Sequence, residues 1–110
     1  MPRDDALLAD VAQACELIGE LIGGLDFAAF SSDVRTYWAT VSQLMIVGEA
    51  IKGLSPGFRE AHPSIAWSDI ARMRDKLIHH YNDIDDQEVW EAAARDIPAL
   101  LAYVRPLLPR

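Results

Sequence analysis

Residues 67–81 read WSDIARMRDKLIHHY, a stretch with the spacing of an amphipathic helix and one charge that does not fit it. With Ile70 set at zero and about 100 degrees added per residue, the apolar positions gather within about 60 degrees of it. They are Ile70, Met73, Leu77 and Tyr81. Arg74 falls at about 40 degrees, inside this apolar face. The pattern predicts a helix over residues 64–80 that carries an arginine on its core face.

Arg74 needs a partner, because a guanidinium held in an apolar site without one costs several kcal/mol of folding free energy. One interpretation is an internal ion pair, for which Glu49 is the candidate carboxylate. The other is that Arg74 lines a groove and receives an anionic ligand, since the planar fork of its N–H donors matches a phosphate group. The residues leave both interpretations open.

A second apolar segment, residues 34–54, is too hydrophobic for a helix with a single buried face. Its core face carries Tyr37, Val41, Leu44, Val47, Gly48 and Ile51. Trp38, Met45 and Ile46 extend onto another face. A helix that is apolar most of the way round is either central in its bundle or shared with a second chain. We interpret these three residues as a candidate homodimer surface, with the monomer core as the alternative, and expect Gly48 to let another helix approach closely.

The first helix predicted from the sequence has one apolar face and should stop at Gly23-Gly24. Residues 26–30 should form a short turn before the second helix, for which Ser31, Ser32 or Asp33 is the expected cap.

The last predicted helix spans residues 85–105. Asp85 and Glu88 match the capping-box pattern at its start, and Pro98 lies on its outer face, which favours a bend over a break. No segment alternates convincingly as a strand. The sequence therefore predicts an all-α fold, an up-and-down bundle of four main helices in a single domain, residues 1–110, that pairs as a homodimer.

The composition limits the classes of function. The net charge of −7 argues against a protein that coats nucleic acid through its overall charge, so any contact with nucleic acid should be local. No apolar run reaches the roughly 18 residues of a membrane span. The one cysteine, Cys15, lies on an apolar helix face and fits a packed core thiol. We expect a cytoplasmic protein without disulfides and without membrane contact.

His79 and His80 end the predicted third helix, and His79 lies about 140 degrees round from Arg74 in an unbroken helix. The two residues can act together only if the helix ends or distorts near His79, or if they meet across a subunit boundary. Both possibilities predict a composite site, whereas the plainer interpretation is two polar residues favoured by the helix dipole. A metal site is not expected, because adjacent histidines diverge and no HExxH or CxxC motif accompanies them.

The spacing Arg74-x4-His79-x-Tyr81 resembles the signature of the HepT-like toxins, a branch of the HEPN (higher eukaryotes and prokaryotes nucleotide-binding) superfamily. The similarity extends to residues 47–52, VGEAIK, which look like the second-helix segment of that family. Residues 67–81 look like its core block, and residues 85–90 also fit. The resemblance spans nearly the whole chain and implies a HEPN-like helical bundle.

This resemblance implies a metal-independent endoribonuclease that needs no cofactor and acts as the toxin of a type II toxin–antitoxin system. Arg74 and His79 would be its catalytic residues. Arg74 would hold the scissile phosphate of the RNA, and His79 would act as general acid or base for attack by the ribose 2′-hydroxyl. Two such motifs would face each other across a homodimer formed by the second and third helices.

The resemblance also implies regulation by a minimal nucleotidyltransferase antitoxin, which would transfer AMP from ATP to Tyr81. The AMP would place bulk and negative charge beside the phosphate-binding group. We expect Asp75, His80 and Glu49 to be supporting residues. Asp75 stands where the family commonly has asparagine, and it puts a carboxylate near the expected RNA site.

The alternative is a non-catalytic HEPN module that serves as the binding partner of a nucleotidyltransferase. The two functions predict different surroundings for Arg74. An Arg74 exposed in a cleft near His79 favours the enzyme, and a buried pair of Arg74 with Glu49 favours the module.

Overall fold

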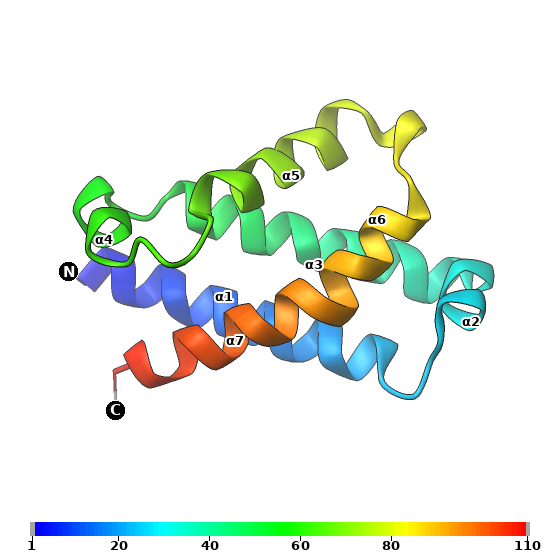
Figure 1. Ribbon diagram of the computed structural model, residues 1–110, viewed down its shortest axis with the longest axis horizontal. Helices are drawn as coiled ribbons and strands as arrows, with labels where there is room; N and C mark the ends of the chain where they lie inside the picture. The colour runs from blue at the N-terminus through cyan, green and yellow to red at the C-terminus, as the bar shows by residue number, and fades with distance from the viewer. Residues whose placement is uncertain (1, 110) are drawn as a thin grey trace.

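The computed structural model describes residues 2–109, which fold into helices without a strand. The elements in chain order are α1 (Pro2–Ile22), α2 (Phe27–Ser32), α3 (Val34–Lys52), α4 (Pro56–Ala61), α5 (Trp67–His79), η1 (Tyr81–Asp83), α6 (Asp86–Glu91), η2 (Ala92–Asp96), α7 (Ile97–Val104) and η3 (Arg105–Leu107). Figure 1 shows α1, α3, α5 and the α6–η2–α7 segment as the long members of a bundle. The predicted all-α bundle is confirmed.

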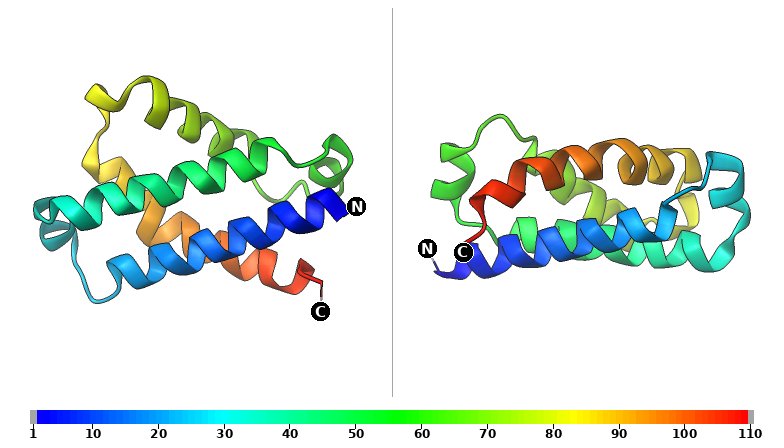
Figure 2. Two further views of the ribbon diagram at one scale, coloured as in Figure 1. Left: turned by 180° about the vertical axis from the view of Figure 1, so that it is seen from behind. Right: turned by 90° about the horizontal axis from the view of Figure 1, so that it is seen from below.

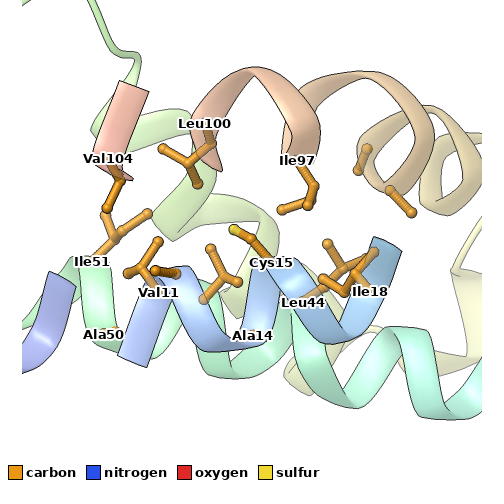
Figure 3. Close-up of a cluster of buried hydrophobic side chains, with 14 of the residues drawn as sticks. Val11, Ala14, Cys15, Ile18, Leu44, Ala50, Ile51, Ile97, Leu100 and Val104 are labelled. Atoms are coloured by element: carbon orange, nitrogen blue, oxygen red, sulfur yellow. The ribbon is translucent and has the colours of Figure 1, made fainter. Parts of the chain in front are cut away.

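The core lies where α1 packs on α3 and on α7. Figure 3 shows these three helices contributing apolar side chains to one cluster, in which Val11, Ile51 and Val104 are fully buried. Cys15 belongs to the same cluster, and burial raises the pKa of its thiol to about 12. The interpretation of Cys15 as a packed core thiol is therefore confirmed.

Helix α5 packs mainly on α3, and Figures 1 and 2 show α3 lying between α5 and α1. The contact is closest at Gly48 of α3, which lies directly beneath Arg74 of α5: a Cβ added at Gly48 would overlap the Arg74 side chain and lie 3.3 Å from its Cα. Gly48 does let another helix approach, as predicted, and that helix is α5 of the same chain.

Two short helices lie between the long ones, and the first of them, α2, replaces a segment that we expected to be a turn. Residues 27–32 form α2, with the Asp26 carboxylate accepting the Ala29 N–H at 2.8 Å. Helix α3 ends at Lys52 rather than near residue 54, and α4 follows it after Ser55, whose hydroxyl oxygen accepts the Phe58 N–H. Asp33 caps α3, as expected.

Helix α5 is shorter than the predicted span 64–80, because it begins at Trp67 and ends at His79. The indole N–H of Trp67 donates to the His62 carbonyl at 2.8 Å, which anchors the start of the helix to the preceding loop. Tyr81 therefore lies outside the helix in η1 and is 61% exposed. Its assignment to the apolar core face was wrong, since that face ends with the helix.

The last helix continues past Pro98, as predicted. Just before the proline it contains the π-helical segment η2. There the Ile97 N–H donates to the carbonyl of Ala92, five residues earlier, and this wider turn precedes the proline that cannot donate. Asp85 caps α6 through the Gln87 N–H. The other half of the expected capping box is absent, because the Glu88 carboxylate accepts from Lys76 of α5 instead.

The outer face of α3 remains exposed in a single chain. Trp38 is 47% and Ile46 is 44% exposed, while Met45 is half-buried against the core. Within residues 2–109, no helix has both the length and the hydropathy needed to cross a membrane.

The substitution Gly48→Ala should destabilise the fold by about 1–3 kcal/mol, because the new methyl group forces α5 away from α3. Gly19→Ala is the matched control, since Gly19 also lies within a helix but has open space around its Cα. This control should be neutral or stabilising by up to about 1 kcal/mol. Denaturant unfolding of both variants tests the contact, and equal stabilities would contradict it.

Asp4 ties the start of α1 to the loop after α3. Its two carboxylate oxygens accept the Ser55 N–H at 2.8 Å and the Ser55 hydroxyl at 2.7 Å. These bonds, the backbone one first, lower the pKa of Asp4 in the folded state. The unfolded state therefore binds more protons, and the stabilisation is present above the ordinary Asp pKa and lost as the pH falls through the folded value.

The variant Asp4→Asn should accordingly lose less stability than the wild type on acidification below about pH 4. Thermal unfolding followed across the acidic range measures the difference between the two proteins. Parallel pH profiles would show that Asp4 does not carry this linkage.

Candidate functional site

Arg74 is held over Gly48 by carboxylates from two helices. Its Nη2 lies 2.8 Å from Glu49 Oε2 of α3, and its Nη1 donates to Asp75 Oδ1 at 2.9 Å. The Arg74 side chain is 21% exposed, whereas that of Glu49 is 64% exposed. Of the two interpretations offered by the sequence, the ion pair with Glu49 is therefore present, at the edge of the bundle rather than in its interior.

The guanidinium is not fully satisfied. Its Nε is buried and has no hydrogen-bond partner among the residues that the structure describes. Both terminal nitrogens face carboxylates, so an anionic ligand reaching Arg74 has to compete with one of them. The more exposed competitor is Glu49.

Asp75 is the central acceptor of the cluster. Its Oδ1 accepts from Lys52 Nζ at 2.9 Å as well as from Arg74 Nη1. These hydrogen bonds, the one from Lys52 first and the one from Arg74 second, lower the pKa of the Asp75 carboxyl. We name the group Glu49, Lys52, Arg74 and Asp75 the α3–α5 charge cluster.

Lys52 was not among the residues singled out from the sequence. A signal for it existed, because Glu49 and Lys52 are three residues apart and lie on neighbouring positions of one helix face. That spacing does not show which residue of another helix Lys52 meets. The packing of α5 on α3 supplies this information.

His79, His80 and Tyr81 lie where α5 ends. The His80 N–H donates to the Lys76 carbonyl at 2.9 Å, and the backbone then leaves helical geometry at His80. All three side chains are exposed, and within residues 2–109 none of them is hydrogen-bonded to the charge cluster. The single chain thus brings together Arg74, Glu49 and Asp75 but leaves the histidines and the tyrosine apart from them.

Helix geometry still places His79 close to one member of the cluster. Asp75 and His79 are four residues apart within α5 and so lie on the same side of the helix. Arg74 and His79 remain about 140 degrees apart. The helix ends at His79, which was one of the two arrangements foreseen for a composite site.

Two surface pockets lie beside α3 or α5. A shallow groove of about 360 Å³ runs between the start of α1 and the end of α3, and Glu49 and Lys52 line it. A second, of about 380 Å³, is largely apolar and lies between α5 and α7, over Leu44 and Val47 of α3. Neither is lined by Arg74 or His79.

No group of three or more His, Cys, Asp or Glu residues within the described part of the chain is placed to hold a metal ion.

Comparison with known proteins identifies the family. A family model described as "Ribonuclease HepT-like" matches residues 11–107. The "Probable ribonuclease HepT" of Thermococcus cleftensis is 43% identical over 93 residues, which are 84% of this chain and 84% of that protein.

Other relatives agree over a similar length. A "Putative RNase" of Caldanaerobacter subterraneus subsp. tengcongensis is 39% identical over 103 residues, 94% of this chain and 92% of that protein. One from Methanocaldococcus jannaschii is 34% identical over 100 residues, 89% of this chain and 83% of that protein. A search of solved structures finds no significant match. The match over residues 11–107 and the identity to these relatives confirm the resemblance seen in the sequence, and the chain belongs to the family of HepT-like ribonucleases.

Proposed function

We propose that the protein is a metal-independent endoribonuclease, the toxin of a type II toxin–antitoxin system that acts on RNA in the cytoplasm. Membership of the HepT-like ribonuclease family supports an RNase-type enzyme with RNA as substrate. The observation that carries the site assignment is the position of Arg74. A guanidinium at the α3–α5 crossing, with an exposed carboxylate on Nη2, is suited to exchange that carboxylate for a phosphate.

The proposed reaction needs only groups that this chain supplies. The ribose 2′-oxygen attacks the adjacent phosphorus, the bond to the 5′-oxygen of the next nucleotide breaks, and a 2′,3′-cyclic phosphate remains. Arg74 stabilises the negative charge that develops on the phosphoryl oxygens. His79 takes the proton of the 2′-hydroxyl as general base or gives one to the leaving oxygen as general acid.

A homodimer would bring the two groups together. By helix geometry Trp38, Met45, Glu49 and Lys52 share one face of α3. The exposed apolar part of this face therefore continues directly into the charge cluster. Pairing of two chains through α3 and α5 would bury Trp38 and Ile46 and would place each Arg74 beside the boundary, within reach of the partner chain's α5.

A second function remains supported by one specific observation. The Arg74–Glu49 ion pair is formed, and this was the arrangement expected of a non-catalytic module that binds a nucleotidyltransferase. The exposure of Glu49 favours the enzyme, because an exposed carboxylate exchanges with a ligand more readily than a buried one.

Cleavage of a mixed RNA substrate in excess EDTA tests the enzyme. The variants Arg74→Ala and His79→Ala should each lower kcat by about 10²- to 10⁴-fold, because each removes a group that acts in the transition state. Arg72→Ala is the matched control: Arg72 is exposed on the same helix, pairs with Asp69 one turn away, and should cleave like the wild type. No cleavage by unmodified wild-type protein, or equal cleavage by all four proteins, would favour the non-catalytic module.

Mixing the two inactive variants tests whether the site is composite. If Arg74 of one chain works with His79 of the other, each mixed dimer contains one intact site, and refolding the variants together should restore about a quarter of the wild-type activity. A mixture as inactive as its components would place both residues of the working pair in one chain.

Tyr81 is the proposed acceptor of AMP from the antitoxin. Of the three tyrosines it is the exposed one, at 61%, while Tyr37 and Tyr103 are half-buried. It follows His79 by two residues, so an added nucleotide would bring bulk and negative charge to the end of α5.

With ATP and a minimal nucleotidyltransferase antitoxin, the wild type should gain the mass of one AMP and lose its cleavage activity. Tyr81→Phe should gain no mass and keep cleaving, whereas Tyr103→Phe, which loses only a hydroxyl bonded to His62, should be modified like the wild type. Intact-mass measurement reads the result, and AMP on Tyr81→Phe would refute the assignment.

A further inference from the structure

Asp75 presents a difficulty for any RNA site at Arg74. Its carboxylate lies 2.9 Å from the same guanidinium that is to hold a phosphate. Two anions beside one guanidinium repel each other, and the chain as a whole already carries a net charge of −7. The charge of Asp75 must therefore be neutralised before a phosphodiester can bind beside it at Arg74.

Lys52 is in position to do so. Its Nζ lies 2.9 Å from Asp75 Oδ1, the same oxygen that accepts from Arg74. Lys52 is the last residue of α3, and Asp75 belongs to α5, so the contact spans the two helices that form the site.

The C-terminal end of α3, which carries Lys52, is held by hydrogen bonds from α4. Arg59 of α4 donates through Nη2 to the carbonyl of Ile51 at 3.1 Å and to that of Lys52 at 2.9 Å. The Lys52 carbonyl has no partner within the helix, and the Ile51 carbonyl also accepts the Leu54 N–H at 3.1 Å. The backbone of Lys52 is thus held while its side chain reaches across to α5.

The charges of the cluster balance only when Lys52 is counted. In the free protein two cations, Lys52 and Arg74, face two carboxylates, Glu49 and Asp75. When a phosphodiester replaces the exposed Glu49 at Arg74, the remaining groups are two cations and one carboxylate, which match the single charge of the incoming phosphate. Without Lys52 the same exchange leaves one cation against two anions.

We propose that Lys52 is the counter-ion of Asp75 that makes the Arg74 site compatible with RNA. Lys52 is a positioning residue: it acts through Asp75 and does not take part in bond breaking. The inference rests on the proposed ribonuclease function and adds a residue to it.

Steady-state cleavage by the full chain tests this role through a double substitution. Lys52→Ala should raise KM for a short single-stranded RNA by about three- to tenfold with little change in kcat, the size expected for one uncompensated charge at a partly exposed site. Lys52→Ala combined with Asp75→Asn should return KM to near the wild-type value, because the carboxylate that needed neutralising is gone. Raising the salt concentration should shrink the defect of the single variant.

The matched control is Arg95→Ala, which removes an equal charge and an ion pair with Glu91 in the α6–η2 segment, outside the α3–α5 charge cluster. It should leave KM unchanged. Thermal unfolding of every variant accompanies the kinetics. If Lys52 served only to tie α3 to α5, the double variant would still lack the tie, and its KM would stay raised.

The two proposals fail in different ways. Wild-type protein that neither binds nor cleaves RNA would overturn the ribonuclease function and this inference with it. Wild-type cleavage together with an unchanged KM in Lys52→Ala, or with no recovery in the double variant, would overturn the role of Lys52 alone.

Discussion

The close contact between Gly48 of α3 and Arg74 of α5 fixes where the guanidinium lies. Without a Cβ at position 48, the two helices approach until the Arg74 stem rests on the α3 backbone, and Arg74 Nη2 lies 2.8 Å from Glu49 Oε2. The stem of an arginine can be buried while its head remains at the surface. This explains how a charged residue occupies the core face of an amphipathic helix without an isolated buried charge.

If the chain binds RNA as proposed, it needs a local group that attracts phosphate, because its net charge is −7; the α3–α5 charge cluster is the proposed place for it. In the free chain Glu49 pairs with Arg74 Nη2, and it is the more exposed of the two carboxylates that Arg74 contacts. Asp75 accepts from Arg74 Nη1 on its own helix, and Lys52 Nζ of α3 donates to the same Asp75 oxygen. The cluster contains two cations and two carboxylates, so its formal charges balance while no ligand is bound.

The two faces of α3 differ in their surroundings. Its inner face is buried in the core, where Val47 and Ile51 lie, and its outer face leaves Trp38 and Ile46 exposed. The outer apolar residues and the charge cluster occupy one side of the helix, so the proposed dimer surface and the proposed RNA site adjoin each other. Helix α5 ends at His79, so His80 and Tyr81 lie outside its helical geometry, next to the same region.

Much of this protein could be predicted from residue periodicity, because burial of an apolar stripe is a local property of each helix. The all-α class, the cap at Asp33, the continuation through Pro98 and the Arg74, His79 and Tyr81 motif were all legible in the sequence. The end of α5 before Tyr81 and the pairing of Glu88 with Lys76 were not, since they depend on contacts between segments distant in the chain. Sequence alone named Glu49 as a possible partner of Arg74. Only the packing of α5 on α3 decided that this pair forms and that Lys52 meets Asp75. The physical reason is that the distance between charges on two helices is set by how closely their backbones approach.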